Sequence, residues 1–329
     1  MASFSMTDTN TPNSKSIEVM KHEIKSQLAL PAQFELAEQI DPTRCVMTGS
    51  GDSYVAASIA SYLSDSRIIC CYPSTLILNP NILSNRDLYI ISISGRTAHN
   101  IAVARLAKQS NIKTIAITAD PQSELAKNCD RIIRINYRKS GVLTSGTVSF
   151  LSSVLTCISL TTKVMYNTKK LRSAFEIANS MVDDLLKKIP VTLSSILFLA
   201  DGLLYPVACY GSLKMNEVLG IRSFPYSLEE YCHAPLFSIK KDDSVVILNS
   251  SEVHDTNAKT VSKFTEKLDR LNYSFFSLDF PVSSSIAGLF QSIFLVQLLA
   301  LKTAERNGMT DCFFVRSRDL MEISSGYIY

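Results

Sequence analysis

Leu-Tyr-Ile-Ile-Ser-Ile-Ser-Gly-Arg-Thr, residues 88–97, is the stretch that decides the fold. Its apolar half, Leu88–Ser92, predicts a buried strand, and the helical spacing of apolar residues over Asn100–Gln109 predicts a helix just after it. A continuous apolar strand that leads through a polar loop into a helix is typical of a parallel sheet covered on both faces.

The same rhythm extends in both directions along the chain. Further strands are expected at Cys45–Gly49, Arg67–Cys71, Lys113–Thr118, Arg131–Asn136, Ser195–Ala200, Ser244–Asn249 and Tyr273–Leu278. Helices are expected at Ser53–Leu63, Ser145–Lys163, Leu171–Lys188, Pro206–Leu219, Asp255–Leu271 and Ile286–Asn307. The alternation predicts an α/β protein of two tandem three-layer αβα domains with mainly parallel sheets, and fewer strands in the second domain.

The domain organisation is predicted from the places where the alternation of strands and helices is interrupted. The polar residues 1–15 are interpreted as a flexible leader, and residues 16–170 as the first domain. Residues 171–190 are interpreted as a connecting helix, and residues 191–329 as the second domain.

Composition excludes several classes of function. A formal net charge of +3 does not favour nucleic acid or an anionic membrane as a partner. The eight cysteines form no C-x-x-C pair, which argues against structural zinc and disulfides and favours a reducing cytoplasm. Ile286–Ala300 is apolar, but it contains two glutamines and is short for a membrane span, so we expect a buried helix.

The loop after Leu88–Ile91 is a candidate phosphate site. Ligands of open α/β sheets gather beyond the carboxyl ends of strands, and a helix N-terminus offers unpaired N–H groups to an anion. Hydroxyl donors would come from Ser92, Ser94 and Thr97, with Ile93 in the same loop. The alternative is an ordinary serine-rich helix cap.

Two other polar loops occupy equivalent positions. Gly51 and Ser53 follow the Cys45–Gly49 strand, and Thr144 lies in a loop that opens a later helix. Tyr54 stands where a dinucleotide fingerprint requires its third glycine, and no P-loop motif occurs, so neither a nicotinamide cofactor nor a P-loop is expected. Three such loops in one domain predict a shared pocket.

A second group of candidates carries acid–base chemistry. Lys214 and Glu217 are three residues apart on an expected helix and share a face, either as an exposed ion pair or as part of a site. His233, one of four histidines, lies in an expected loop and is either incidental or catalytic. Cys232 is its sequence neighbour, so a cysteine–histidine nucleophile is a poor alternative, and no residue spacing suggests a metal ligand set.

Together these motifs resemble the sugar isomerase (SIS) domain family, over about Met20 to Leu320. The resemblance is to the isomerase half of glutamine–fructose-6-phosphate aminotransferases and to stand-alone glucosamine-6-phosphate deaminases and phosphosugar isomerases. The segments that carry it are Met20-x-x-Glu23-Ile24-x-x-Gln27, Gly49–Tyr54, Ser92–Ala98, Gly141–Ser145, Tyr205-Pro206, Lys214, Glu217 and His233–Leu236.

The resemblance implies roles for these residues. Ser92, Ser94 and Thr97 would hold a sugar phosphate, with Ser53 and Thr144 on the sugar hydroxyls. The Glu217 carboxylate would move a proton between C1 and C2, and Lys214 would counter the developing oxyanion charge. His233 would assist ring opening, and in this family it can come from a partner subunit, which implies a homodimer.

Two departures from the family pattern bear on the reaction. We expect no glutaminase half before Met20, and Glu322 occupies the position where the family synthase carries an imine-forming lysine. The resemblance therefore implies a phosphosugar isomerase or deaminase that acts on a hexose or hexosamine 6-phosphate, such as glucosamine 6-phosphate or fructose 6-phosphate, without a metal or organic cofactor. The alternatives are a phosphoglucose- or phosphomannose-type aldose–ketose isomerase and a non-catalytic phosphosugar-sensing protein.

Overall fold

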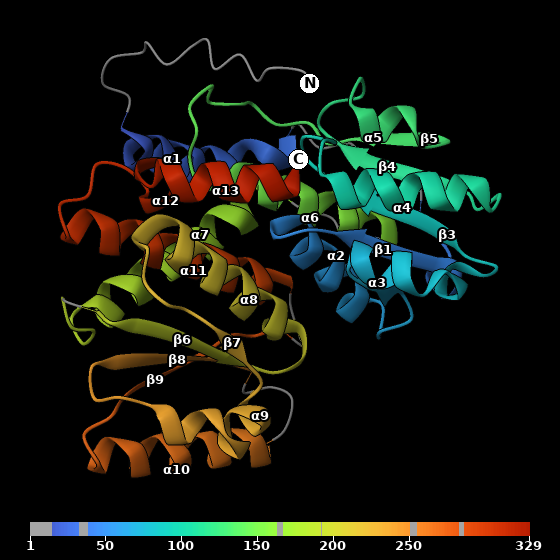
Figure 1. The fold of residues 1–329 in the computed structure, drawn as a ribbon. Coiled ribbons are helices and arrows are strands. Elements are labelled where there is room, and N and C mark those ends of the chain that lie inside the picture. Colours follow the sequence, from blue (N-terminus) through green and yellow to red (C-terminus); the bar gives the residue numbers. More distant parts are fainter. Residues whose placement is uncertain (1–14, 33–38, 163–166, 192, 251–254, 283–285) are drawn as a thin grey trace.

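The computed structural model describes residues 15–32, 39–162, 167–191, 193–250, 255–282 and 286–329. The expected leader, residues 1–15, lies outside the described residues except for Lys15. The chain forms two parallel sheets with helices on both faces of each sheet, as the sequence predicts (Figure 1).

The first sheet has five parallel strands in the order β2-β1-β3-β4-β5. These strands are β1 (Cys45–Gly49), β2 (Ile69–Cys70), β3 (Asp87–Ile91), β4 (Thr114–Thr118) and β5 (Arg131–Arg134). The chain steps from β1 to one side to form β2 and then to the other side to form β3. The topological switch point, where α/β proteins bind ligands, therefore lies between β1 and β3.

Side chains of the first sheet alternate between two hydrophobic clusters, because successive strand residues face opposite sides. Met47 and Ile91 pack with α2 (Asp52–Leu63) and α6 (Val148–Thr161). Val46, Leu88 and Ile90 pack on the other face, which is covered by three helices. These helices are α3 (Pro73–Leu78), α4 (Ala98–Gln109) and α5 (Glu124–Lys127).

The second sheet has four parallel strands in the order β7-β6-β8-β9, one fewer than the first sheet. These strands are β6 (Ser195–Ala200), β7 (Pro225–Tyr226), β8 (Asp243–Asn249) and β9 (Ser274–Asp279). One face carries α7 (Thr168–Leu186), α8 (Tyr205–Lys214) and α11 (Ile286–Arg306). The opposite face carries α9 (Leu228–His233) and α10 (Asp255–Arg270), as Figure 1 shows.

One continuous hydrophobic cluster joins the two halves. It runs from α2 and α6 to α7, α8 and α11, and α1 (Ser16–Ser26) packs against α11. By length and hydropathy α11 could cross a membrane, but 83% of its most apolar window is buried inside the fold. The prediction of a buried helix at this position is therefore confirmed, and α11 is the central helix of the core. The exact boundaries between the domains stay a prediction.

Several predicted elements differ from the observed ones. The helix expected over Pro206–Leu219 is instead α8 followed by a π-helical turn at Met215–Leu219. The helix expected from Ser145 begins only at Val148, because the Ser145 and Thr147 hydroxyls are bonded to carboxylates elsewhere in the fold. The sequence analysis also gave no helix at α3 or at the C-terminal α12 (Phe313–Arg316) and α13 (Arg318–Ile328).

Phe150 of α6 stacks on Tyr210 of α8 with ring centroids 3.7 Å apart, so this pair links the two halves. We expect Phe150→Ala to lower the free energy of unfolding in urea by about 3–5 kcal/mol, because it opens a cavity in the shared core. Phe237→Ala, at a position that is 84% exposed, is the matched control and should cost under about 0.5 kcal/mol. Equal costs for the two variants would contradict the shared core.

Candidate active site

Two polar loops leave the first sheet side by side. Gly49 at the end of β1 and Ile91 at the end of β3 are partners in the parallel ladder. The residues that follow them, Gly51–Ser53 and Ser92–Thr97, therefore emerge together at the switch point. The sequence analysis placed both loops at this edge, and the structure brings them together there.

The Ser92–Thr97 loop has the geometry of an anion cradle. Ser92 is buried, and its Oγ accepts a hydrogen bond from the Gly95 N–H at 3.2 Å. Gly95 has φ +61°, and a Cβ there would lie 2.0 Å from Ser123 Oγ, so the position requires glycine. Thr97 precedes α4 and its side chain makes no capping bond, which leaves first-turn N–H groups of α4 for an anion. Ser94 and Thr97 are half-buried.

The neighbouring loop is shaped by glycine as well. Gly51 has φ +55° and precedes α2, whose first residues are Asp52 and Ser53. A Cβ at Gly49 would come within 2.9 Å of Ser53, so the absence of a side chain allows Ser53 to pack close to the strand end. The half-buried Ser53 therefore lies at the same edge as the Ser92–Thr97 loop.

Beside these loops, the Lys214 ammonium is completely buried between two carboxylates. Its Nζ donates to Glu217 Oε2 at 2.6 Å and to Asp52 Oδ2 at 3.0 Å. The Ser145 hydroxyl donates to the same Glu217 oxygen at 2.7 Å. Asp52 and Ser145 belong to the first half of the chain, and Lys214 and Glu217 to the second. We call these four residues the Lys214 cluster.

Burial and neighbouring charges have opposing effects on the pKa values in the Lys214 cluster. Burial raises the pKa of Asp52 to about 6, and the Glu217 carboxylate adds to this, although Lys214 opposes both effects. Burial disfavours the charged form of Lys214, but the carboxylates of Asp52 and Glu217 outweigh it and hold the pKa of the ammonium above its usual range. The buried Lys214 side chain therefore stays positively charged next to the Glu217 carboxylate.

A hydrogen-bonded chain supports the cluster from the core. Tyr210 Oη donates to the Gly146 carbonyl at 2.7 Å, and Gln297 Nε2 donates to Tyr210 Oη at 3.0 Å. Gln27 in turn donates to the side chain of Gln297 at 2.8 Å. A Cβ at Gly146 would lie 2.8 Å from Asp52 Oδ2, so this glycine makes room for the carboxylate. These bonds tie α8, α11 and the N-terminal helical segment to the loop before α6.

Glu217 itself lies on the π-helical turn Met215–Leu219, an arrangement that is frequent at functional sites. Asn216 Nδ2 donates to the carbonyls of Ser212 and Ser223, and these two bonds hold the turn in place. Gly220 ends it with φ +68°, where a Cβ would collide with the ring of Phe313. The side chain of Glu217 keeps 36% exposure, so it can meet a ligand while Lys214 cannot.

Three other predicted site residues make contacts outside the Lys214 cluster. The Thr144 hydroxyl donates to the Ser16 carbonyl at 2.8 Å, and it is the next residue, Ser145, that reaches Glu217. The Ile93 carbonyl accepts from the Ala119 N–H, so its backbone connects the loop to β4. His233 ends α9 on the far face of the second sheet from α8, and its side chain is 70% exposed (Figure 1). Among the described residues, nothing links His233 to the Lys214 cluster within one chain.

The C-terminal helix lies beside the phosphate loop. The Arg96 guanidinium lies 5.4 Å from the ring centroid of Tyr329, and the rings of His99 and Tyr327 are 5.9 Å apart. Glu322, on α13, is exposed. The C-terminal segment that contains Glu322 therefore ends close to the Ser92–Thr97 loop.

The equivalent edge of the second sheet differs in charge. A cavity of about 640 Å³ lies beyond β6 and β8, and its lining includes Asp201, Glu229 and Asn249. Two carboxylates without a lysine or arginine among the described lining residues are unfavourable to a phosphate. This contrast favours the first sheet as the phosphate edge. In the described part of the chain no group of three or more His, Cys, Asp or Glu side chains could hold a metal ion.

Comparisons with known proteins identify similar sequences and folds. The SIS domain model matches residues 39–163. The chain is 29% identical over 243 residues to a glutamine–fructose-6-phosphate aminotransferase (isomerizing) of Sulfurisphaera tokodaii, which covers 68% of this chain but only 40% of that protein. The chain thus spans less than half of the length of this curated relative.

Solved structures show the same fold. The C-terminal domain of glucosamine-fructose-6-phosphate aminotransferase from Francisella tularensis aligns with a TM-score of 0.70 at 18% identity, over 92% of this chain and 98% of that one. Glucosamine-6-phosphate deaminase from Thermotoga maritima aligns with a TM-score of 0.69 at 21% identity, over 90% and 96% of the two chains. At these identities the likeness establishes the fold.

The raised pKa of Asp52 predicts a specific pH dependence. Below a pH of about 4 the carboxyl is protonated in both the folded and the unfolded chain. As pH rises to about 6, the unfolded chain ionises first, so the wild type loses stability relative to Asp52→Asn, by on the order of 2 kcal/mol. Urea unfolding from pH 4 to pH 7 measures this difference.

Asp319→Asn, at an exposed position of α13, is the control, and its difference from the wild type should stay nearly constant over the same pH range. A wild type that gains stability relative to Asp52→Asn between pH 4 and pH 6 would contradict the burial of this carboxyl.

Proposed function

Since residues 39–163 form a SIS domain, we propose that the chain is a phosphosugar isomerase or deaminase that acts on a hexose or hexosamine 6-phosphate. The observation that carries this proposal is the placement of Glu217. Lys214 and Ser145 fix one of its oxygens at 2.6 and 2.7 Å, and the half-exposed carboxylate lies in a cluster that includes Asp52, the residue before Ser53.

The phosphate of the substrate would bind at the Ser92–Thr97 loop. The first-turn N–H groups of α4 and the hydroxyls of Ser94 and Thr97 supply donors at a helix N-terminus. The Ser92 Oγ accepts a hydrogen bond from the Gly95 N–H, which shapes the loop, and its own O–H can still donate to the phosphate. Ser53, across the switch point, would then face the sugar hydroxyls.

Glu217 would move the proton. Its Oε2 already accepts two hydrogen bonds, so Oε1 would take the C2 proton of the open-chain aldose and return it at C1. The electron pair left at C2 forms the C1–C2 double bond, while the π pair of the C1 carbonyl moves to O1, which takes up a proton. The product is an enediol, or an enolamine when C2 carries an amino group. In the second case water is consumed and ammonia leaves, so glucosamine 6-phosphate would become fructose 6-phosphate.

In this proposal Lys214 is a positioning residue. Its side chain is fully buried and its ammonium is already paired with Asp52 and Glu217, so it acts on the substrate through the Glu217 carboxylate. Its hydrogen bond to Glu217 Oε2 holds the carboxylate in one orientation and leaves Oε1 to face the substrate. This replaces the direct contact with an oxyanion that the sequence resemblance implies for Lys214.

His233 requires a second subunit in this scheme. Because α9 lies on the far face of the second sheet, His233 could assist ring opening only at the site of a partner chain, which is the reason to propose a homodimer (Figure 1). All eight cysteines are free thiols, which fits the reducing cytoplasm that we propose as the compartment. The proposed steps use neither a metal nor an organic cofactor.

The second candidate function is a plain aldose–ketose isomerase. The observation that favours it is the exposed Glu322, since an isomerase needs the Glu217 carboxylate but no amine on the C-terminal segment. The two reactions share the proton transfer and differ in whether ammonia is released.

The proposal is tested with purified protein and three substrates: glucosamine 6-phosphate, fructose 6-phosphate with and without ammonia, and mannose 6-phosphate. We expect Glu217→Gln to lower kcat by about 10²–10⁴-fold, because the amide cannot accept the proton, while substrate still binds. Thr97→Ala is the matched control at the phosphate loop and should raise KM with kcat nearly unchanged.

Ammonia release from glucosamine 6-phosphate identifies a deaminase, and hexose phosphate interconversion without ammonia identifies an isomerase. Tight binding of these sugars without turnover of any of them would contradict the enzyme and support a phosphosugar sensor. Full activity in Glu217→Gln would remove this residue from the reaction.

A further inference from the structure

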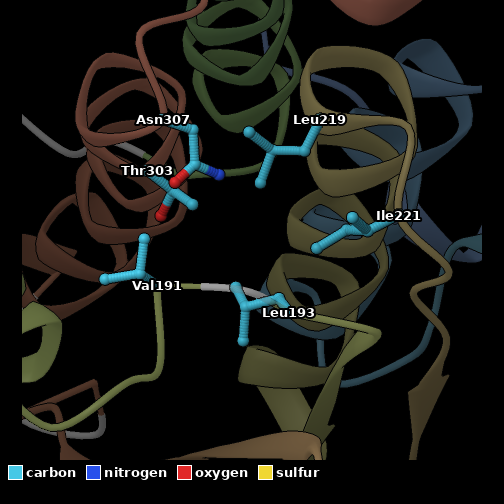
Figure 2. Close-up of a pocket in the computed structure, with 6 residues that line it drawn as sticks. All are labelled: Val191, Leu193, Leu219, Ile221, Thr303 and Asn307. Carbon is cyan, nitrogen blue, oxygen red and sulfur yellow. The ribbon is translucent and has the colours of Figure 1, made fainter.

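A cavity of about 370 Å³ lies behind the turn that carries Glu217, on the side of α11 and the segment that follows α7. Figure 2 shows its two walls. The Thr303 hydroxyl on α11 and the amide of Asn307, the residue after α11, lie next to each other, and four aliphatic side chains face them. These four are Val191, Leu193, Leu219 and Ile221. The volume falls within the range of small-molecule sites, about 300–1,000 Å³.

Thr303 is the residue that points to a ligand. Its side chain is 0% exposed, and its Oγ1 has no hydrogen-bond partner among the described residues. A buried hydroxyl without a partner is costly and rare in folded proteins. On a helix such a hydroxyl ordinarily bonds to a carbonyl one turn earlier. At Thr303 the hydroxyl is left for a partner inside the cavity.

The wall opposite α11 is held in place by the arginine beside Asn307. Arg306 Nη1 donates to the carbonyls of Leu186 and Ile189, at 2.9 and 3.0 Å, and its Nη2 donates to the Pro190 carbonyl at 2.7 Å. These bonds fix the segment that leads into Val191. The part of the wall that contains Val191 is therefore fixed in the folded structure.

The lining restricts the chemistry of that ligand. None of the described lining residues carries a charge, so the cavity does not suit a sugar phosphate or a nucleotide. Aliphatic side chains on one wall favour an apolar body. A hydroxyl and an amide on the other favour one polar group that can both donate and accept.

The cavity also adjoins the candidate active site. Leu219 is the last residue of the π-helical turn Met215–Leu219, and Ile221 follows the left-handed Gly220 that ends it. We propose that this cavity binds a small uncharged molecule with an apolar body and one hydroxyl or carbonyl group, and that the bound molecule restrains the turn that carries Glu217. The site is separate from the phosphosugar site, and the binding does not depend on the proposed reaction.

Binding is tested with 4-methylcyclohexanol by saturation-transfer NMR. We expect saturable binding to the wild type, about tenfold weaker binding to Thr303→Val, and none to Leu193→Phe, which fills the cavity. Leu271→Phe, at a position that is 60% exposed, is the control and should bind like the wild type. No saturable binding to the wild type, or unchanged binding to Leu193→Phe, would overturn the site.

Thr303→Val also tests the premise about the hydroxyl. Because Oγ1 has no partner in the described structure, this near-isosteric change should leave the Tm unchanged or raise it. A clear fall in Tm would show that the hydroxyl is already bonded, and would overturn the proposal.

Restraint of the turn is tested by hydrogen exchange rather than by activity. We expect 4-methylcyclohexanol to slow amide exchange over residues 215–221 in the wild type and not in Leu193→Phe. Saturable binding with unchanged exchange in this segment would overturn the link to Glu217. Both readouts stand whether or not the chain converts a phosphosugar.

Discussion

The buried ammonium of Lys214 is the interaction on which the rest of the structure depends. It sits at 0% exposure with one carboxylate from each half of the chain, Asp52 at 3.0 Å and Glu217 at 2.6 Å. A buried charge is tolerated only when it is paired and hydrogen-bonded. The two halves therefore cannot separate at this point without leaving charges unpaired. The ion network fixes how the two halves pack against each other in the shared hydrophobic core.

The same constraint shapes the candidate active site. Asp52 begins α2, so its bond to Lys214 fixes the loop that contains Gly51 and Ser53. Glu217 is fixed from the other side, and its π-helical turn leaves the carboxylate half-exposed. Because one ion network positions both Asp52, next to Gly51 and Ser53, and Glu217, a change in the packing of the two halves should alter the geometry of the candidate site directly.

Much of the fold could be predicted from the sequence. Strands such as Leu88–Ile91 are short continuous apolar runs. The polar residues that follow them indicate the carboxyl-end edge of the sheet, where ligands of α/β proteins bind. The shared face of Lys214 and Glu217 also followed from local spacing. The sequence resemblance located the SIS domain that the family comparison then matched.

The remaining features depend on contacts that local patterns do not contain. Asp52 lies 162 positions from Lys214, and Ser145 lies 72 positions from Glu217, so their roles arise only when the two halves pack together. Thr144 and Ser145 are neighbouring hydroxyl residues in one loop, and the local sequence does not distinguish which of them bonds to Glu217. A π-helical turn inserts a single residue into an α-helix, and apolar periodicity does not resolve that change.

The most direct test of the Lys214 cluster is a double-mutant cycle on the free energy of unfolding, with Asp52→Asn, Lys214→Met and the double variant. We expect Lys214→Met alone to cost about 1–3 kcal/mol, because it removes the buried ammonium that donates hydrogen bonds to both Asp52 and the half-exposed Glu217. The double variant should cost less than the sum of the single ones, by about 1–3 kcal/mol. Single costs that add to within about 0.5 kcal/mol would contradict the central place of this ion network.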